Sequence, residues 1–169
     1  MDGSSVDLIH GNWDVIARLL AAMVAGFVLG VNRDLRGKAA GVRTHGLVAI
    51  GASLVTIISV EVASVGQYDP NAIARVVQGI ITGIGFIGGG VILKLPEHRT
   101  VQGLTTAASV WIVACLGISF GAGMWRTAVF GLVLTMMALL TGGAIEQIAG
   151  RVFKSRNPDG QPTGHAGGQ

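Results

Sequence analysis

The stretch that decides the fold is VVQGIITGIGFIGGGVILKLPEHRTVQGLTT, residues 76–106. Its first part, residues 76–93, carries no charged side chain, and about eighteen such residues are enough for one helix to cross a hydrocarbon layer. The segment is also rich in glycine, which costs a helix interior about 1 kcal/mol per residue relative to alanine. In lipid, glycines spaced by four let a neighbouring backbone approach closely. The stretch therefore predicts a transmembrane helix with two small-residue faces, Gly79 with Gly83 and Gly85 with Gly89.

The segment Gly83-x-Gly85-x-x-Gly88 also matches the glycine pattern of dinucleotide-binding folds. That pattern works at a turn between a strand and a helix, where backbone amides face a pyrophosphate. Here the glycines lie inside an apolar span and no predicted strand precedes them. The match is therefore interpreted as coincidental, and we expect no nucleotide cofactor.

The composition is typical of a membrane protein. Of the 169 residues, 50 % are hydrophobic and 12 % are charged, which is about half the charged fraction of a soluble domain. The first residues, MDGSSVDLIHGNWD, are acidic and lack the positive start of a signal peptide. We therefore expect the first apolar run to be retained as a helix.

Five apolar spans can be drawn, and they predict an all-α integral membrane protein with five transmembrane helices. The spans are residues 15–31, 46–65, 76–93, 104–120 and 127–144. The short turn Gly121-Ala122-Gly123 predicts that the last two helices are antiparallel. The chain then divides into an N-terminal segment at residues 1–14, a transmembrane domain at 15–145 and a tail at 146–169. The end of this tail is polar and rich in Gly and Pro, so we expect it to be largely disordered.

The basic residues predict the orientation, because Lys and Arg favour cytoplasmic loops. Nine of the twelve lie after the first, third and fifth spans. They are Arg33, Arg36, Lys38, Arg43, Lys94, Arg99, Arg151, Lys154 and Arg156. These regions are expected in the cytoplasm, which places the N-terminus in the periplasm and the tail inside. The net charge of +3 is then a topology signal, and no nucleic-acid partner is expected.

The sequence partly repeats itself at a shift of 57 residues. Ile16-Ala17-Arg18 falls on Ile73-Ala74-Arg75, Gly26 falls on Gly83, and Gly46-Leu47 falls on Gly103-Leu104. This predicts two helix hairpins of the same orientation, related by an axis along the membrane normal, with the fifth helix outside the repeat. Such an axis would bring the glycine faces of spans one and three together. The alternative is that Gly, Ala and Leu match by chance.

Three charges lie at similar depth near the outer membrane edge: Arg18, Glu61 and Arg75. An uncompensated charge within the membrane costs about 3 kcal/mol, so we expect Glu61 to pair with Arg18, Arg75 or both. This outer polar cluster is either a periplasmic-side functional site or a structural arrangement of ion-paired or snorkelling side chains.

The densest polar stretch is VNRDLRGKAAGVRTHGL, residues 31–47. Asp34 is flanked by basic residues and is expected to neutralise and orient one of them. Such a cluster could bind an anionic lipid head group or a phosphate, or it could serve only as a cytoplasmic anchor. His45 stands alone, with no metal partner at helical spacing.

Hydroxyl side chains open the fourth span at Thr105, Thr106 and Ser109. They could bond neighbouring helices or line a polar path. The sequence contains no nucleophile–base pair, no metalloprotease or nucleotide-binding motif, and one cysteine. We therefore expect no enzyme and no cofactor, and the sequence assigns no metal site.

Three segments resemble a known family. They are GVNRDLRGKAAGVRTH at residues 30–45, GIGFIGGGVI at 83–92 and GLTTAASVW at 103–111. Together they resemble the membrane domain of the MgtC/SapB family, over about residues 15–145. Asn32 departs from the pattern, because the family usually has Glu there. A soluble C-terminal domain found in many members is not expected here.

The resemblance implies a multi-pass protein of the bacterial inner membrane, linked to growth at low magnesium and to survival inside host macrophages. It implies regulation through binding to other membrane proteins, including the proton-translocating ATP synthase. The residues that it marks as important are Arg33, Asp34, Arg43, Thr44, Gly83, Gly85, Gly88, Thr105 and Thr106.

A second function remains open, namely a transporter or channel for Mg²⁺ or another small cation at the repeat interface. Magnesium commonly takes one or two carboxylates as ligands. Under the predicted topology Glu61 and Asp34 lie at opposite membrane faces, so they cannot share one ion. A homodimer through the remaining small-residue faces is also open.

Overall fold

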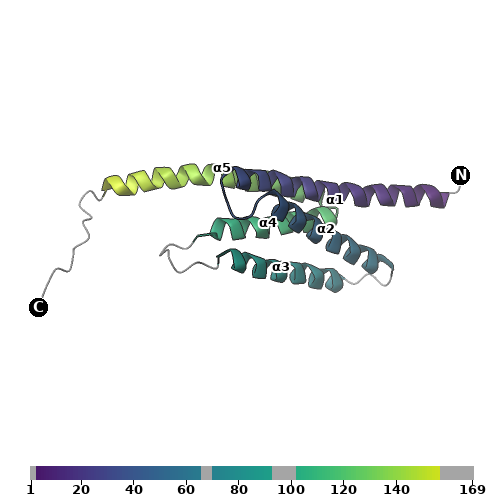
Figure 1. The fold of residues 1–169 in the computed structure, drawn as a ribbon. Helices are drawn as coiled ribbons and strands as arrows, with labels where there is room; N and C mark the ends of the chain where they lie inside the picture. The colour runs from purple at the N-terminus through teal and green to yellow at the C-terminus, as the bar shows by residue number, and fades with distance from the viewer. Residues whose placement is uncertain (1–2, 66–69, 93–101, 157–169) are drawn as a thin grey trace, which may run out of the picture. The chain divides into compact units, whose positions relative to one another are not determined.

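The computed structural model describes residues 3–65, 70–92 and 102–156. These residues form five helices and no strand (Figure 1). The helices are α1 (Gly3–Leu35), α2 (Val42–Val65), α3 (Pro70–Ile92), α4 (Leu104–Gly121) and α5 (Trp125–Arg156). Each contains a segment that is long and apolar enough to cross a membrane. The prediction of an all-helical protein with five helices long and apolar enough to span a membrane is thereby confirmed for the described residues.

Two helices extend well beyond the spans that hydropathy predicts. The apolar segment of α1 is Asn12–Leu35, although the helix begins at Gly3. The apolar segment of α5 is Trp125–Gly142, although the helix continues to Arg156. Residues 146–156, assigned from the sequence to the tail, are therefore helical, and residues 157–169 lie outside the described part. Hydropathy marks only the apolar stretch, whereas helical hydrogen bonding also continues through polar residues.

The chain divides into two compact units, residues 1–133 and 134–169. In the first unit α2 and α4 occupy the centre, because each packs against the other and against both α1 and α3. Figure 1 shows α1 and α3 on either side of this central pair. The second unit contains the remainder of α5.

The central packing depends on glycines that let two backbones touch. A Cβ atom placed on Gly121 of α4 would lie 2.6 Å from the backbone oxygen of Ser53 in α2. One placed on Gly117 would collide with the backbone oxygen of Ala49. On the other side of α2, a Cβ atom on Gly26 of α1 would lie 2.6 Å from the backbone oxygen of His45. Larger residues at these positions would push the helices apart.

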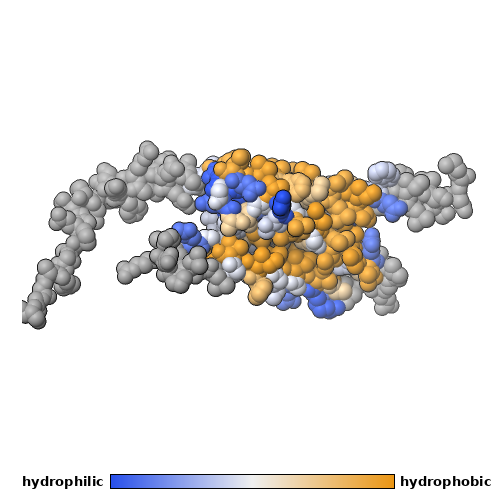
Figure 2. Space-filling view, viewed as in Figure 1, coloured by the Kyte–Doolittle hydropathy of each residue, from blue (hydrophilic) through white to orange (hydrophobic). Residues whose placement is uncertain are grey.

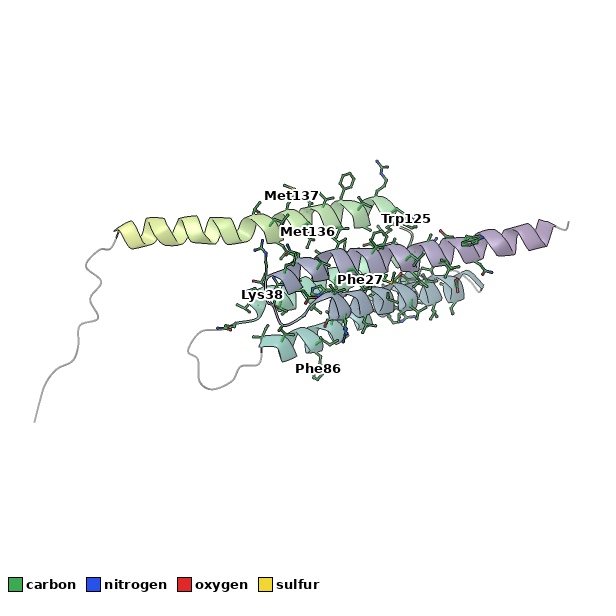
Figure 3. The ribbon with its side chains drawn as sticks, turned by 45° about the horizontal axis from the view of Figure 1, so that its top comes forward. Phe27, Lys38, Phe86, Trp125, Met136 and Met137 are labelled. Atoms are coloured by element: carbon green, nitrogen blue, oxygen red, sulfur yellow. The ribbon has the colours of Figure 1, made fainter. Side chains whose placement is uncertain are left out.

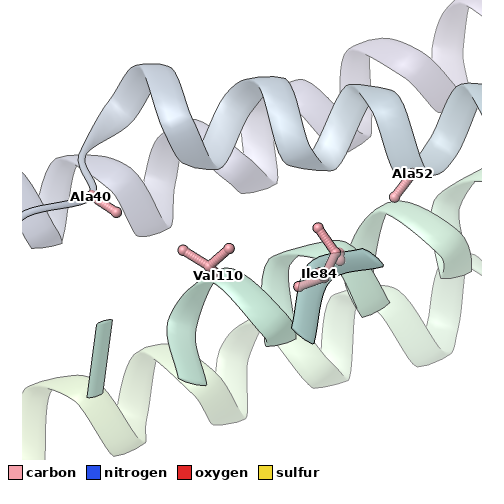
Figure 4. Packing of buried hydrophobic residues seen from close by; sticks show 5 residues of the cluster. Ala40, Ala52, Ile84 and Val110 are labelled. Atoms are coloured by element: carbon pink, nitrogen blue, oxygen red, sulfur yellow. The ribbon is translucent and has the colours of Figure 1, made fainter. Parts of the chain in front are cut away.

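The hydrophobic core is rich in alanine, beside larger buried residues such as Leu29, Leu116 and Phe120. Ala40, Ala52, Ile84, Val110 and Ala114 form one buried cluster, and Figure 4 shows Val110 and Ile84 in the middle of the view, between Ala40 at one end and Ala52 at the other. Much larger apolar side chains face outward. In Figure 2 hydrophobic residues cover the middle of the visible face and hydrophilic residues gather toward its ends. An apolar surface of this extent is what a lipid environment favours.

The first turns of α5 run back along α4, as the short turn between them predicts. Phe120 and Trp125 meet edge to face, with their ring centroids 5.6 Å apart. Ala128 is fully buried, and a Cβ atom on Gly131 would lie 3.2 Å from Leu116.

One expected contact is wrong. The repeat predicted that the glycine faces of spans one and three meet, but Gly26 and Gly30 of α1 pack against α2. The loop between α1 and α2 is short enough to return the chain directly onto the small face of α1, so α2 takes the place expected for α3. The repeat itself stays a prediction.

We predict that Gly117→Ala destabilises the protein by about 1–3 kcal/mol, because its Cβ has no room against the α2 backbone. Gly51→Ala is the matched control, since nothing lies within 4 Å of a Cβ at that position. It should leave stability unchanged or raise it by up to about 1 kcal/mol through helix propensity. Thermal unfolding in detergent micelles measures both, and equal effects of the two changes would contradict the packing described.

Candidate functional site

A buried polar cluster lies where α1, α2 and α4 meet. It consists of Arg33, His45, Thr106 and Ser109, which are between 0 % and 3 % exposed. Arg33 lies in the last turn of α1, His45 lies in the first turn of α2, and the two hydroxyls lie in the first turns of α4. Segments that are far apart in the sequence are thereby joined through polar side chains inside the bundle.

Hydrogen bonds connect the polar cluster across the three helices. Arg33 Nη2 donates to Thr106 Oγ1 at 2.6 Å, and Ser109 Oγ donates to the Thr106 backbone oxygen at 2.8 Å. His45 Nε2 lies 3.1 Å from Ser109 Oγ. His45 Nδ1 lies 3.0 Å from the backbone oxygen of Gly41. A carbonyl oxygen only accepts hydrogen bonds, so Nδ1 carries a proton.

The turn between α1 and α2 positions Arg33 and His45. The backbone N–H groups of Arg36 and Lys38 both donate to the Arg33 backbone oxygen, at 3.2 and 3.1 Å. Asp34 Oδ2 accepts a hydrogen bond from the backbone N–H of Val42, at 3.0 Å, where α2 begins. The sequence predicted that Asp34 orients a basic side chain, whereas the structure shows it holding the start of α2.

Glycine at the start of α4 positions Thr106 and Ser109. Gly103 has φ +90°, and a Cβ atom on it would lie 2.5 Å from the Val91 backbone oxygen. Both facts favour glycine, because L-residues rarely adopt this conformation. The helix then begins with the bond from Ala107 N–H to the Gly103 oxygen, at 2.8 Å. The three-residue spacing of Thr106 and Ser109 puts both on the buried side of α4.

The structure brings together only some of the residues marked from the sequence. Arg33 and Thr106 form the polar cluster. Asp34, Arg43 and Thr105 are exposed and Thr44 is partly exposed. Gly83 and Gly85 lie on α3, where nothing approaches within 4 Å of a Cβ, and Gly88 contacts Ala107. Whether these residues bind a ligand stays a prediction.

His45 is the residue whose role the sequence interpretation missed. It was interpreted as isolated, but it is fully buried and bonds to Gly41 and Ser109. Its partner Ser109 is 64 residues away in the chain, so no local spacing could have indicated the contact. The available signal was a histidine directly before a glycine at the start of an apolar span.

In the outer polar cluster, the structure shows two contacts of Arg18 that the sequence did not predict. Arg18 forms an ion pair with Asp14, one helical turn earlier, at 2.6 Å. It also donates to the backbone oxygen of Gly121 at 3.0 Å, which anchors the end of α4 to α1. Glu61 is exposed, and its pairing with Arg18 or Arg75 stays a prediction.

The described residues contain no group of three or more His, Cys, Asp or Glu side chains that could hold a metal ion. The polar cluster is built around the cation of Arg33 and neutral hydroxyls. Its chemistry therefore suits an anion or a hydrogen-bonding group better than a divalent cation.

One helix face has no neighbour within the described residues. We name it the open α3 face, formed by Gly79, Gly83, Phe86 and Gly90. Nothing lies within 4 Å of a Cβ placed on any of these glycines. Phe86 is 86 % exposed and points away from the helices (Figure 3). Their spacing places all four on one side of α3, opposite the buried Ile84 and Gly88.

Comparison with known proteins gives one family and several relatives. The sequence profile of the MgtC family matches residues 19–148. SrpB of Synechococcus elongatus is 38 % identical over 150 residues, covering 84 % of this chain and 82 % of that protein. The putative magnesium transporter YhiD of Escherichia coli K12 is 39 % identical over 132 residues, covering 75 % of this chain and 59 % of that protein.

MgtC of Salmonella typhimurium LT2 is 37 % identical over 123 residues, covering 73 % of this chain and 50 % of that protein. The chain thus spans most of SrpB but only about half to three fifths of YhiD and MgtC. No solved structure matches.

We predict that Thr106→Val lowers stability by about 1–3 kcal/mol, because the buried Arg33 guanidinium loses an acceptor while the side-chain volume is kept. Thr105→Val is the control, since Thr105 is exposed at the neighbouring position, and should change stability by less than about 0.5 kcal/mol. Thermal unfolding of both variants in the same detergent checks this. A Thr105→Val effect as large as that of Thr106→Val would contradict the polar cluster.

Proposed function

The chain belongs to the MgtC family, and on this premise we propose that it is a regulatory protein of the bacterial inner membrane. It acts by docking transmembrane helices of other membrane proteins onto the open α3 face. The setting is adaptation to low magnesium and survival inside host cells, which the family resemblance implies. The proposal concerns the membrane domain alone.

The observation that supports docking is the contrast between two sets of glycines. The α2 backbone occupies the space beside the glycines of α1 and α4, and we call these glycines filled. On the open α3 face nothing lies within 4 Å of a Cβ atom placed on the glycines, and we call these unfilled. Each unfilled glycine costs the helix about 1 kcal/mol relative to alanine. Close packing of another helix can offset this cost, because helix association in lipid depends on van der Waals contact at small residues.

The open α3 face fits a partner helix that has its own small residues. Phe86 stands between Gly83 and Gly90 on this face, so it can insert beside a small residue of the partner. Partners proposed from the resemblance are other membrane proteins, among them the proton-translocating ATP synthase. A second copy of this chain would compete for the same face.

We propose that the N-terminus lies in the periplasm and the C-terminus in the cytoplasm, on the strength of the basic residues around the turn between α1 and α2 and at the C-terminal end of α5. This orientation places the polar cluster toward the cytoplasmic membrane face. The ends of α1 and α2 that carry Arg33 and His45 would then be the part of the bundle that cytoplasmic molecules can approach.

Cation transport is the second candidate, because one relative is named a putative magnesium transporter. Among the described residues no cluster of metal-ligating side chains supports it. The buried Arg33 opposes it further, since a guanidinium repels a divalent cation.

The docking proposal is tested by a photo-cross-linking amino acid in place of Phe86, in cells grown at low magnesium. Phe130 on α5, which is 66 % exposed, is the matched control position. We expect an adduct with a membrane protein from position 86 and none of that mass from position 130. Mass spectrometry identifies the protein and tests for an ATP synthase subunit.

A second variant tests whether the adduct comes from specific docking or from chance encounters in the membrane. Gly83→Leu should remove the adduct and the growth advantage at low magnesium, while Gly51→Leu, at an equally open position of α2, should change neither. Adducts that persist in Gly83→Leu, or that contain only a second copy of this chain, would overturn docking of a different protein.

Transport is tested by flux into liposomes that contain only the purified chain. We expect no Mg²⁺ flux above that of empty liposomes. Robust flux that is lost in Glu61→Gln would establish the transport function in place of the regulatory one.

A further inference from the structure

Arg33 carries a buried charge without a buried counter-charge among the described residues. Its side chain is 98 % removed from solvent, since 2 % is exposed. Among the described residues, the Arg33 guanidinium makes one hydrogen bond, in which Nη2 donates to the neutral hydroxyl of Thr106. The buried Arg33 Nε has no hydrogen-bond partner among them. Burying a charge is costly unless it is paired. An anion beside Arg33 would offset this cost.

The N-terminus of α4, which Arg33 contacts through Thr106, also favours an anion. The first N–H groups of an α-helix have no partner inside the helix, and in α4 the first helical bond is made by Ala107. The residue before the helix, Gly103, offers no side-chain cap. The N-terminus of a helix also carries a partial positive charge. The Arg33 guanidinium and the start of α4 are thus two positive groups in contact through Thr106.

Asp34, the acidic residue next to Arg33, does not neutralise the Arg33 guanidinium. Asp34 follows Arg33, but its carboxylate is exposed and accepts the Val42 N–H. Arg36 and Lys38, the next charged residues, are also positive and exposed. Asn32 is neutral, and its buried Oδ1 has no partner among the described residues.

We propose that Arg33 and the first turn of α4 form a binding site for a phosphate group. A guanidinium matches phosphate oxygens with parallel N–H donors, and the free amides of a helix N-terminus bind the same group. Gln102, Leu104 and Thr105, at the start of α4, are exposed beside the buried Thr106. The site is separate from the open α3 face and does not depend on the docking function.

The position of the site allows two sources of phosphate. Arg33 lies near the end of the apolar segment Asn12–Leu35, and Thr106 lies near the start of Leu104–Gly121. Both therefore lie at the end of an apolar segment, which is the depth at which the head-group phosphates of a spanned bilayer would lie. A phosphate from the aqueous side reaches the same depth.

The experiment uses the full chain in nanodiscs. In phosphatidylcholine nanodiscs, binding of radiolabelled inorganic phosphate is measured by equilibrium dialysis. In mixed nanodiscs, the phosphatidylglycerol that stays bound to the released protein is measured by native mass spectrometry. Arg33→Gln keeps a hydrogen-bond donor toward Thr106 but removes the charge, and Arg36→Gln removes an exposed charge three residues away.

We expect Arg33→Gln to weaken binding at least tenfold in one of the two arms and Arg36→Gln to weaken it less than twofold. Loss in the dialysis arm identifies free phosphate, and loss in the lipid arm identifies a head group. Equal losses in both variants would show only surface attraction, and absence of binding in both arms for the wild type would equally overturn the site.

Because Arg33→Gln could fail to fold, the wild-type chain provides an independent readout. A ligand that binds the folded state raises its melting temperature. We expect the occupying phosphate, either free or in phosphatidylglycerol, to raise the melting temperature. Chloride at equal ionic strength should not, and an equal rise with chloride would overturn the proposal.

Discussion

The structure depends on direct contact between helix backbones at glycine. Gly117 and Gly121 let α4 lie against the backbone of α2, and Gly26 lets α1 lie against its other side. In lipid there is little hydrophobic drive for helices to associate, so such close contact is a main source of packing energy. It also has a chemical consequence, because it brings the side chains of three helices within hydrogen-bonding distance. Arg33 reaches Thr106 only because these helices lie so close together.

The same chain uses glycine in two ways, and this distinction connects the fold with the proposed function. Where glycines are filled, they fix the bundle and enclose the polar cluster. On the open α3 face they are unfilled and stand beside an exposed aromatic ring. A bundle that has closed its own contacts on one side can offer a second small-residue surface to another protein without unfolding. The docking function that we propose rests on this contrast between the two sets of glycines.

The sequence predicts the helices better than it predicts their neighbours. Length and apolar content define the five spans, because a membrane crossing requires both. Glycine spacing shows that one face of a helix carries small residues. The same spacing occurs on a face that packs against another helix and on a face that does not. For this reason the contact of Gly26 with α2 was assigned to α3, and Gly83 was expected to be packed. His45 shows the same limit, since its partner lies in another helix. The arginine and threonine of the polar cluster were found because each belongs to a conspicuous segment.

The most direct measurement is solid-state NMR of the chain in lipid bilayers, with labelled protein diluted in unlabelled protein so that only contacts within one molecule appear. We predict a correlation between the Cα of Gly117 and the carbonyl carbon of Ala49. For Gly83 we predict correlations only with residues of α3 and with lipid acyl chains. If Gly83 correlates with another helix of the same molecule, or Gly117 does not correlate with α2, the division into filled and open glycine faces is contradicted.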